Sequence, residues 1–555
     1  MPSFTLDHYK PAADGVTDDT AVLRRCFHDV ECSGGGTVVI PPGDYLVSGE
    51  GSIPIPSRTT VFAHGARFHL PEVLGPKARL VLFSGQNVTG FAWHGGCFIG
   101  HAFDHRRPSN TWEPNANSRM FVITTSPGGT SDNLLFRDIH SERVAGAVIN
   151  VEGSLRPDSE SEVDTFATNI AIRDCWLAES GKFMWDYGLL WQILVWPEDY
   201  TAEDLALARR YFRNDLIRGP VGMADGDDRV WFAGGVSEPT VCFLGGKLPA
   251  NIVRGRRYPV VDSGPGFIRI ADAPGEAPLR FSGTAGKDAH LICNLHHAFY
   301  HLFAPIGAGP GKGALDLTGC RGTSVSGNRL SALGDTMHIM RCHNNVFANN
   351  QILGSRMGAF FLAEHCKNSS ITGNTVDGTN GSRVMSVERS NEDVTIAGNT
   401  FRGGGRGSWI NQPRQLVMQG NIFINNTTKG EHDPWRGRRS FETGGYEQWA
   451  EMYFTRYQPS GTYGPVILSG NLFVTGPESS DAITFADGGH DILLDGNVFE
   501  GPTRTVRVAR GCMDMNIGRN PGMEIVDERS DNGGDRRLQN MEPAVLGRTC
   551  AGRDK

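Results

Sequence analysis

The chain has 555 residues, with 71 glycines, 30 prolines and only 21% charged residues. This composition is typical of a turn-rich β protein and argues against a disordered or mainly helical chain. A formal net charge of −8 argues against binding through nucleic acid phosphates or anionic lipids, so neither partner is expected.

No apolar run reaches the roughly 20 residues that a membrane-spanning helix needs, and the N-terminal MPSFTLDHYK lacks the basic and apolar regions of a signal peptide. A cytoplasmic location is therefore expected for the chain as written, and a secreted or periplasmic one if a signal has been removed. Eleven cysteines without a CxxC pair predict small buried thiols rather than disulfides or a metal site.

Two stretches near the N-terminus stand out, ADGVTDDTAVLRRCF (13–27) and GGGTVVIPPGDYLV (34–47). They resemble the opening of the pectin-lyase-like superfamily, in which a helix caps the first coil and a strand and turn follow. The resemblance implies an all-β, right-handed parallel β-helix over roughly 1–195 and 290–525. A cap is physically reasonable, because an open solenoid end would expose its core and a free strand edge. No single activity is implied, since hydrolases, lyases, epimerases and phage tailspikes share this opening.

An aromatic segment, MWDYGLLWQILVW (184–196), follows the first coils and contains Trp185 and Asp186. If Asp186 faces a groove, burial beside aromatic rings would suit it to general acid catalysis, with Trp185 in contact with the substrate. The alternative is that these side chains fill the junction with an inserted module.

An inserted subdomain is predicted at 198–290, where the β-helix resemblance fails. The segment TAEDLALARRYFR (201–213) has helical periodicity, and the sequence after it predicts short strands of a small β-barrel-like module. The predicted divisions are thus 1–197, 198–290, 291–526 and a cap or tail at 527–555. Three histidines after the insertion are interpreted as packing or substrate-binding groups rather than metal ligands: His296, His297 and His301.

The C-terminal half repeats a Gly-Asn or Asn-Asn pair every 22 to 26 residues, with one interval of 50. Alternating apolar and polar residues surround each pair, which predicts strand, turn and strand. Stacked coils lie about 4.8 Å apart, so the amides can form a ladder. The interval of 50 predicts either two coils or one coil with a long loop. The predicted ladder consists of Asn328, Asn350, Asn374, Asn399, Asn421, Asn471 and Asn497, and a buried thiol row of Cys320, Cys342 and Cys366 precedes it by eight residues.

Counting back from these asparagines predicts which strand residues face outward, because side chains alternate along a strand. The residue twelve positions before each ladder asparagine is predicted to face outward, and the residue eleven positions before it is predicted to lie in the core. For the coil that ends at Asn374, this makes Leu362 outward and Ala363 inward. The outward set twelve before is Asp316, His338, Leu362 and Trp409; the next outward column is Thr318, Met340, Glu364, Glu388, Asn411 and Asp487.

Glu364 and Glu388 are thereby predicted to stack on adjacent coils. Two like charges at that separation raise one pKa, so the pair could divide into an acid and a base or nucleophile, as glycoside hydrolysis requires. The alternative is a pair of surface carboxylates bridged by Arg383, Arg389 or Lys367. The substrate-binding candidates around the pair are His338, Asp316, Arg383, Trp409 and Asn411.

Two further regions bear on the site. Asp335 begins a coil and is a catalytic candidate, with a turn-capping role as its alternative. The segment 425–463 is too long for a simple turn and is rich in aromatic and charged residues that bind sugars, among them Glu442 and Trp449. It is predicted to form the wall of a groove.

These features predict a carbohydrate-active enzyme, first of all a glycoside hydrolase or transglycosylase acting on oligosaccharides or chain ends. A polysaccharide lyase with Arg383 or Arg389 as base is the first alternative, and Ca²⁺ would then be expected; otherwise no cofactor is expected. A non-catalytic glycan-binding or tailspike-like protein is the second alternative. The expected partner is an oligo- or polysaccharide, and a homo-oligomer is left open.

Overall fold

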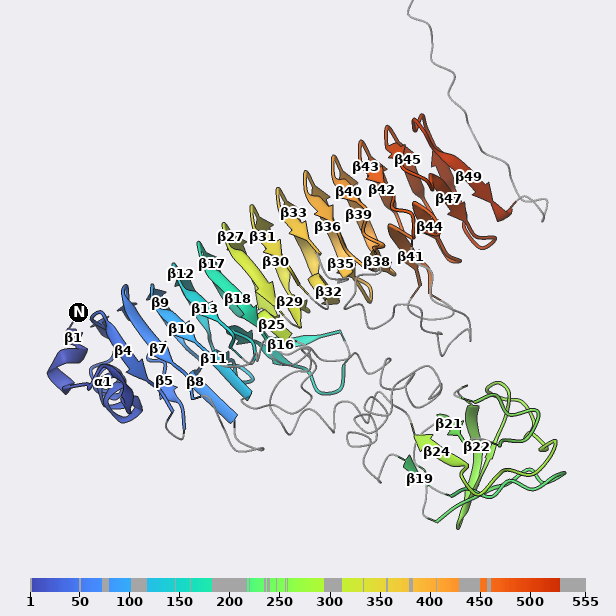
Figure 1. Ribbon diagram of the computed structural model, residues 1–555, viewed down its shortest axis with the longest axis horizontal. Coiled ribbons are helices and arrows are strands. Elements are labelled where there is room, and N and C mark those ends of the chain that lie inside the picture. The colour runs from blue at the N-terminus through green and yellow to red at the C-terminus, as the bar shows by residue number, and fades with distance from the viewer. Residues whose placement is uncertain are drawn as a thin grey trace, which may run out of the picture.

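The structure, a computed structural model, describes residues 2–48, 51–71, 79–100, 117–144, 146–159, 161–181, 217–218, 220–233, 236, 240–245, 247–254, 256, 258–293, 312–332, 334–355, 358–378, 383–405, 407–428, 450–456 and 461–529. These residues wind into a right-handed parallel β-helix, in which successive coils contribute strands to three long sheets (Figure 1). The fold class predicted from the sequence is confirmed.

The three sheets are named A, B and C. Sheet A contains β1 (Ser3–Thr5), β3 (Gly36–Val39), β6 (Thr59–Phe62), β9 (Thr89–His94), β12 (Asp132–Arg137), β17 (Ala167–Arg173), β26 (Cys320–Arg321), β27 (Ser324–Ser326), β30 (His343–Ala348), β33 (Lys367–Thr372), β36 (Glu392–Ala397), β39 (Arg414–Gln419), β42 (Val466–Ser469), β45 (Ile492–Asp495) and β48 (Met515–Ile517).

Sheet B contains β2 (Asp14–Asp18), β4 (Gly43–Leu46), β7 (Ala66–His69), β10 (Cys97–Ile99), β13 (His140–Glu142), β18 (Trp176–Ser180), β28 (Arg329–Ala332), β31 (Gln351–Leu353), β34 (Thr375–Asp377), β37 (Thr400–Arg402), β40 (Ile422–Ile424), β43 (Leu472–Val474) and β46 (Val498–Glu500). Sheet C contains β5 (Ile53–Pro54), β8 (Arg79–Gln86), β11 (Asn117–Thr124), β14 (Ile149–Glu152), β25 (Lys312–Thr318), β29 (Asp335–Met340), β32 (Gly358–Glu364), β35 (Arg383–Val387), β38 (Ser408–Asn411), β41 (Met452–Thr455), β44 (Ile483–Phe485), β47 (Thr505–Val508) and β49 (Glu524–Asp527).

The turn from sheet A to sheet B carries the predicted asparagine ladder. Asn399 is typical: its backbone and side-chain N–H groups both donate to Oδ1 of Asn421, at 3.0 and 2.9 Å. The ladder continues one step past the predicted set, to Asn520. Strand β39 pairs directly with β42, so the interval of 50 residues is one coil with a long connection.

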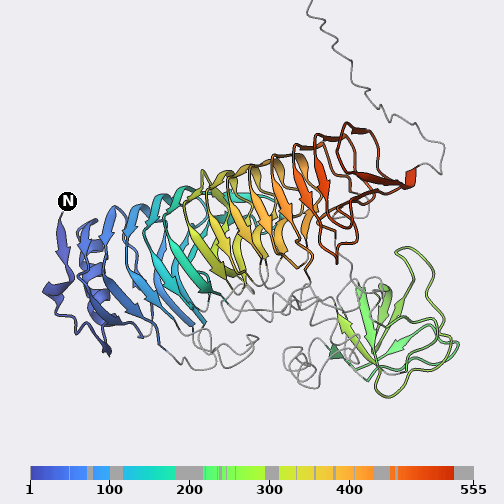
Figure 2. The same ribbon diagram turned by 45° about the horizontal axis from the view of Figure 1, so that its top comes forward.

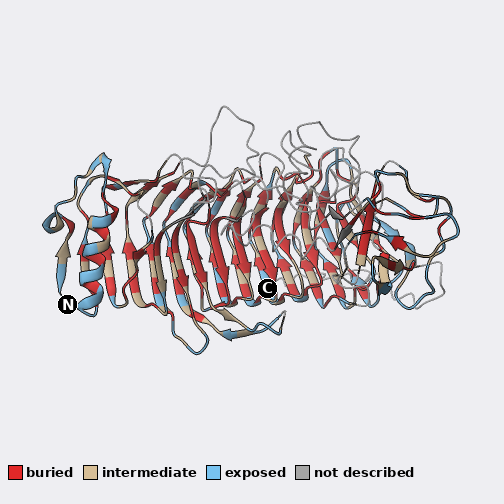
Figure 3. Cartoon of the chain, turned by 90° about the horizontal axis from the view of Figure 1, so that it is seen from below, coloured by how far each residue is buried: buried red, intermediate tan, exposed pale blue. Residues whose placement is uncertain are grey.

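Buried residues run along the whole solenoid (Figure 3), and those that form its core cluster are hydrophobic. Phe401, Phe423, Phe473 and Phe499 stack on successive coils with ring centroids 5.0 to 5.1 Å apart. The predicted thiol row is confirmed, because Cys320, Cys342 and Cys366 are all fully buried.

Helix α1 (Thr20–Cys32) closes the N-terminal end. Its buried side chains are spaced three, four and seven residues apart, which places them on one face. Phe27 lies on that face and packs against Phe83 of β8, with ring centroids 5.5 Å apart. The predicted capping helix is thus confirmed, and a short 3-10 helix, η1 (Leu6–Tyr9), precedes it. No helix in the described ranges is long and apolar enough to cross a membrane.

Connections from sheet B to sheet C differ greatly in length. Only two residues separate β28 from β29, whereas 131 residues, 181–311, separate β18 from β25. That long connection contains a second sheet with the order β19-β24-β21-β22-β23-β20 and its own apolar core (Figure 2). Its strands are β19 (Ile217–Arg218), β20 (Val230–Trp231), β21 (Thr240–Leu244), β22 (Tyr258–Gly264), β23 (Phe267–Ile270) and β24 (His290–Cys293). A two-stranded hairpin, β15 (Ser154–Leu155) and β16 (Val163–Thr165), lies between sheets C and A.

Several predicted features lie outside the described residues. They include the helical segment 201–213, the histidines at 296, 297 and 301, and the tail after Arg529.

Candidate functional site

A single row of side chains crosses the outer face of sheet C. The strand register places its members directly opposite one another on successive coils, about 4.8 Å apart. Asp316, His338 and Trp409 lie in this row as predicted. From N- to C-terminal coils the row is Asn150, Asp316, His338, Phe361, Ser386, Trp409, Tyr453 and Thr484.

The predicted positions of Leu362 and Ala363 are wrong. Leu362 is fully buried and lies opposite Ile339 in the core, whereas Phe361 takes the outward position opposite His338. The register shifts by one residue between β29 and β32, where Glu364 rather than Ala363 lies opposite Met340. Such a bulge cannot be found by counting, because one extra residue exchanges the two faces of the strand.

Asp316 and His338 form a buried polar pair within the row. Nδ1 of His338 lies 3.1 Å from Oδ1 of Asp316, and their side chains are only 10% and 3% exposed. The amide of Asn150 donates to the other carboxylate oxygen at 3.0 Å. The ring of Phe361 packs edge-on against the imidazole, with centroids 5.3 Å apart. The imidazole is therefore held in one orientation by a carboxylate, an arrangement that suits proton transfer.

Glu364 lies between two guanidinium groups. Its Oε1 accepts from Nη2 of Arg341 at 2.9 Å, and its Oε2 accepts from Nη1 of Arg389 at 3.2 Å. The carboxylate side chain is 12% exposed. Two arginine side chains therefore hold this carboxylate by charge-assisted hydrogen bonds.

Glu388 also has an arginine neighbour. Nη1 of Arg383 lies 3.6 Å from its Oε1, and the same guanidinium lies 4.3 Å from the ring centroid of Trp409. Lys367 instead pairs with Glu392. Each of the two predicted catalytic carboxylates thus has a cation beside it, so repulsion between them is not the dominant electrostatic effect at this face.

The remaining predicted residues fall into two groups. Asn411 accepts the backbone N–H of Arg389 at 3.2 Å and so belongs to the same cluster. Asp335 begins β29, and its carboxylate lies over Gly358, where a Cβ atom would contact it. Trp185, Asp186, Glu442 and Trp449 lie outside the described residues.

Sequence reasoning missed Asn150, Phe361 and Arg341. Asn150 precedes Asp316 by 166 residues, and the coils before the insertion lack the asparagine repeat that would have aligned it. Arg341 is a corner residue with φ of 53°, so strand alternation could not predict its direction. Phe361 was hidden by the bulge.

Comparison with known proteins agrees with this architecture. The profile of a family described as periplasmic copper-binding protein (NosD) matches residues 309–436. No protein of curated function matches the sequence. A tailspike protein of E. coli bacteriophage HK620, solved with a hexasaccharide, aligns over 95% of this chain and 78% of its own, with 11% identity and a TM-score of 0.50. The chain has the pectin-lyase-like fold.

Other proteins with this fold align less closely. They include the A-module of the Azotobacter vinelandii mannuronan C-5 epimerase AlgE6, with 11% identity, coverage of 94% and 99%, and a TM-score of 0.43. PfbA, a surface adhesin of Streptococcus pneumoniae, has 10% identity, coverage of 94% and 93%, and a TM-score of 0.44. At such identities the shared feature is the β-helix itself.

The described residues of this pectin-lyase-like chain within the segment 309–436 do not fit copper. Each thiol of the row Cys320, Cys342 and Cys366 donates to a backbone carbonyl, at 3.4 to 3.5 Å. Burial raises the pKa of Cys320 and Cys366 well above the ordinary value, which disfavours the thiolate that binds metal. No three His, Cys, Asp or Glu side chains gather into a metal-binding group within the described ranges.

Proposed function

We propose that this protein is a carbohydrate-active enzyme that binds a glycan along the outward row of sheet C and hydrolyses it. The observation that carries the proposal is the buried pair of Asp316 and His338 beside the arginine-held Glu364. Cleavage of a glycosidic bond uses one group that protonates the leaving oxygen and a second that activates water, and His338 and Glu364 are proposed for these two roles.

In this proposal His338 is the acid. Asp316 stabilises the protonated imidazole, and His338 gives its proton to the leaving oxygen as the bond from the anomeric carbon breaks. Glu364, held in place by Arg341 and Arg389, takes a proton from the attacking water. The strand spacing and rise place the Cα atoms of His338 and Glu364 roughly 8 Å apart, so both side chains can reach one bound glycan.

The row also suits the length of an oligosaccharide. From Asn150 to Trp409 it crosses six strands, or roughly 24 Å. Beyond Trp409 follows Tyr453, which is 38% exposed and can stack on a sugar ring. The phage tailspike with the same fold was solved with a hexasaccharide, which favours a glycan of this size.

The test is to incubate the full chain with a panel of neutral and acidic oligosaccharides and to measure new reducing ends. His338→Gln and Glu364→Gln should each lower the rate by about 100-fold or more, since each removes a proton-transfer group. Glu392→Gln, which changes a carboxylate on sheet A paired with Lys367, is the matched control and should retain full activity. Equal activity in all three variants would contradict the proposal.

A uronate-specific lyase is the second candidate, favoured by the three arginines gathered at this face: Arg341, Arg383 and Arg389. They could neutralise a uronate carboxylate while His338 takes the adjacent proton. Ultraviolet absorbance from an unsaturated product, measured in the same reactions, would support the lyase and contradict the hydrolase. Binding of glycans without any cleavage would leave a tailspike-like binding protein.

A further inference from the structure

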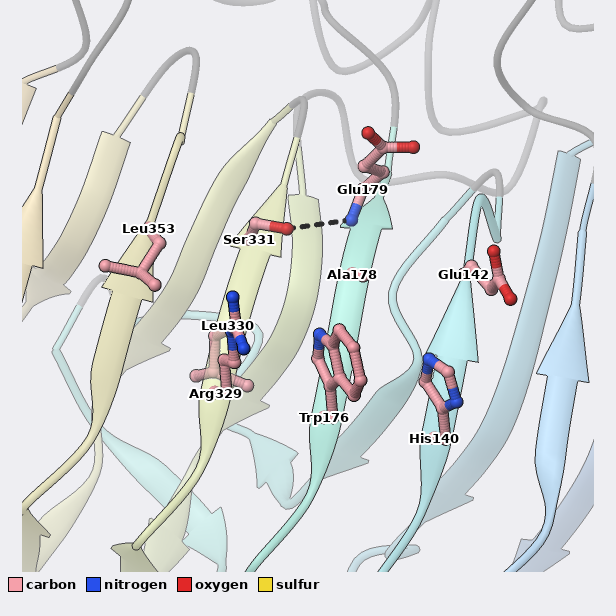
Figure 4. A pocket seen from close by; sticks show the side chains of 9 residues that line it. All are labelled: His140, Glu142, Trp176, Ala178, Glu179, Arg329, Leu330, Ser331 and Leu353. Carbon is pink, nitrogen blue, oxygen red and sulfur yellow. Dashed lines mark hydrogen bonds between the residues drawn. The ribbon is translucent and has the colours of Figure 1, made fainter.

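A groove of about 390 Å³ lies on the outer face of sheet B, away from the row on sheet C (Figure 4). It runs over β13, β18 and β28 and is lined mainly by polar and aromatic side chains. The residues that matter for its chemistry are His140, Glu142, Trp176, Glu179, Arg329 and Ser331.

The floor of the groove is a stack of three flat groups on successive coils. The rings of His140 and Trp176 are nearly parallel, with centroids 4.6 Å apart, and the guanidinium of Arg329 lies 4.9 Å from the centroid of Trp176. Both ring faces of Trp176 are therefore covered, and the 47% exposed indole presents its edge. A ligand would meet N–H donors here rather than an open aromatic face.

Cys97 lies beside His140, with its Sγ 3.6 Å from Nδ1 of the ring. The floor thus offers the N–H groups of Trp176 and Arg329 together with the ring nitrogens of His140.

A bulge supplies an acceptor at the rim. Ala178 and Glu179 together lie opposite Ser331, so the register shifts and the extra residue, Glu179, faces solvent instead of the core. Its backbone is left-handed, with φ of 50°, and its N–H donates to Oγ of Ser331 at 3.0 Å. Left-handed backbone is costly for a residue other than glycine, and bulges often redirect a side chain beside a binding site.

Two carboxylates therefore border a floor of donors. Among the described residues, neither Glu142 nor Glu179 has an ion-pair partner or a side-chain hydrogen bond, so both can accept from a ligand. The two carboxylates outnumber the single guanidinium of Arg329, so the groove disfavours an anion. A neutral group with many hydroxyls can donate to the carboxylates and accept from the floor.

We propose that this groove is a second glycan-binding site, which holds a neutral sugar residue while the row on sheet C performs the chemistry. The proposal rests on the proposed function for its class of ligand, but its residues belong to a different sheet. The two sites can therefore fail independently.

The experiment is binding of the labelled full chain to an array of immobilised neutral, amino-sugar and uronate-containing glycans. The double variant Glu142→Gln/Glu179→Gln keeps the side-chain shapes and should weaken binding to neutral glycans by about tenfold or more. Glu500→Gln is the matched control, because Glu500 lies exposed in the same outward column of sheet B but outside the groove. It should bind as the unchanged chain does.

His338→Gln separates the two sites. If it abolishes cleavage but leaves neutral-glycan binding on the array, both proposals are supported. If it abolishes array binding while the double variant binds normally, the groove on sheet B is not a glycan site, although the proposed function stands. Failure of the unchanged chain to bind any neutral glycan, or binding confined to uronate-containing glycans, would also overturn this inference.

Discussion

The ladder asparagines do more than form turns, because each one connects three coils. Asn399 donates to the backbone carbonyl of Ile371 on one side and to the side chain of Asn421 on the other, and it accepts from Asn374. All three asparagines are at most 2% exposed. Removal of one amide therefore leaves buried donors and acceptors without partners on two neighbouring coils.

Asn399→Ala should accordingly lower the free energy of unfolding by about 2–4 kcal/mol, through several lost hydrogen bonds and the groups that they leave unsatisfied. The control is Asn516→Ala, which changes an exposed asparagine on the outer side of β48 and should cost less than about 0.5 kcal/mol. Denaturant unfolding measures both. A cost for Asn399→Ala no larger than that of the control would show that the ladder is not a major source of stability.

Glu451 is a buried carboxyl group at the junction of a long connection with β41. Burial raises its pKa to about 7, although the backbone N–H of Asn426 donates to both oxygens at 2.9 Å. The ordinary pKa of this group is 4.5. At a pH between 4.5 and about 7, Glu451 therefore keeps its proton in the folded protein but has lost it in the unfolded chain. Stability contributed by this proton is fully present below pH 4.5 and is lost as the pH rises to about 7.

The predicted loss is about 3 kcal/mol across that window. Glu451→Gln should remove this pH dependence, because the amide keeps an acceptor for Asn426 without titrating. Unfolding of both proteins at about pH 5 and about pH 8 gives the comparison. An identical pH dependence in the two proteins would mean that Glu451 ionises at its ordinary pKa.

The aromatic stack on the inner face of sheet B is the clearest case in which an element depends on its neighbours. Phe423 lies between Phe401 and Phe473 and is fully buried. Truncation there would leave a cavity bounded by two coils that cannot close it, since each is held by its own ladder hydrogen bonds.

Phe423→Ala should therefore cost about 3–5 kcal/mol of unfolding free energy. Phe62→Ala is the comparison, because Phe62 lies 42% exposed on the outer face of sheet A and contacts only His94 in an aromatic pair. Its cost should stay below about 1 kcal/mol. Thermal unfolding of the two variants would measure the difference, and equal losses would contradict a cooperative stack.

The coils that could be predicted from the sequence are those in which the turn from sheet A to sheet B has a constant length. Between β27 and β46 every turn from sheet A to sheet B has two residues, so the Gly-Asn period revealed the coils and the outward positions of Asp316 and His338. The same counting failed at Leu362, where a bulge intervenes, and it could not reach Asn150. It also missed Arg341, which occupies a left-handed corner position, whereas Arg389 was among the predicted partners of the carboxylates.

At the scale of the whole molecule, the described residues form two separate apolar cores. The inserted sheet packs around its own cluster, which includes Phe243, Tyr258 and Ile270, and all of its strand pairs are antiparallel. The solenoid core contains none of these residues. A set of strands with its own core and no shared sheet can fold as a unit.

Residues 217–293 expressed alone should therefore fold cooperatively. Dispersed amide proton resonances and a single thermal transition would support this prediction. The control is the same segment with Phe243→Ala, which removes a fully buried ring from the centre of the cluster and should abolish the transition. A wild-type segment without dispersed resonances would show that the inserted sheet needs the solenoid to fold.

The unequal connections between sheets B and C have a consequence for how such a protein can change over evolutionary time. Residues added between β40 and β41 leave the hydrogen-bonding register of β39 with β42 intact, as the present 27-residue connection does. Selection can therefore lengthen, shorten or replace the segments at this one corner while the rest of each coil stays constrained. The sequence of these connecting segments can therefore change without changing the β-helix. New binding loops are best grafted at this corner.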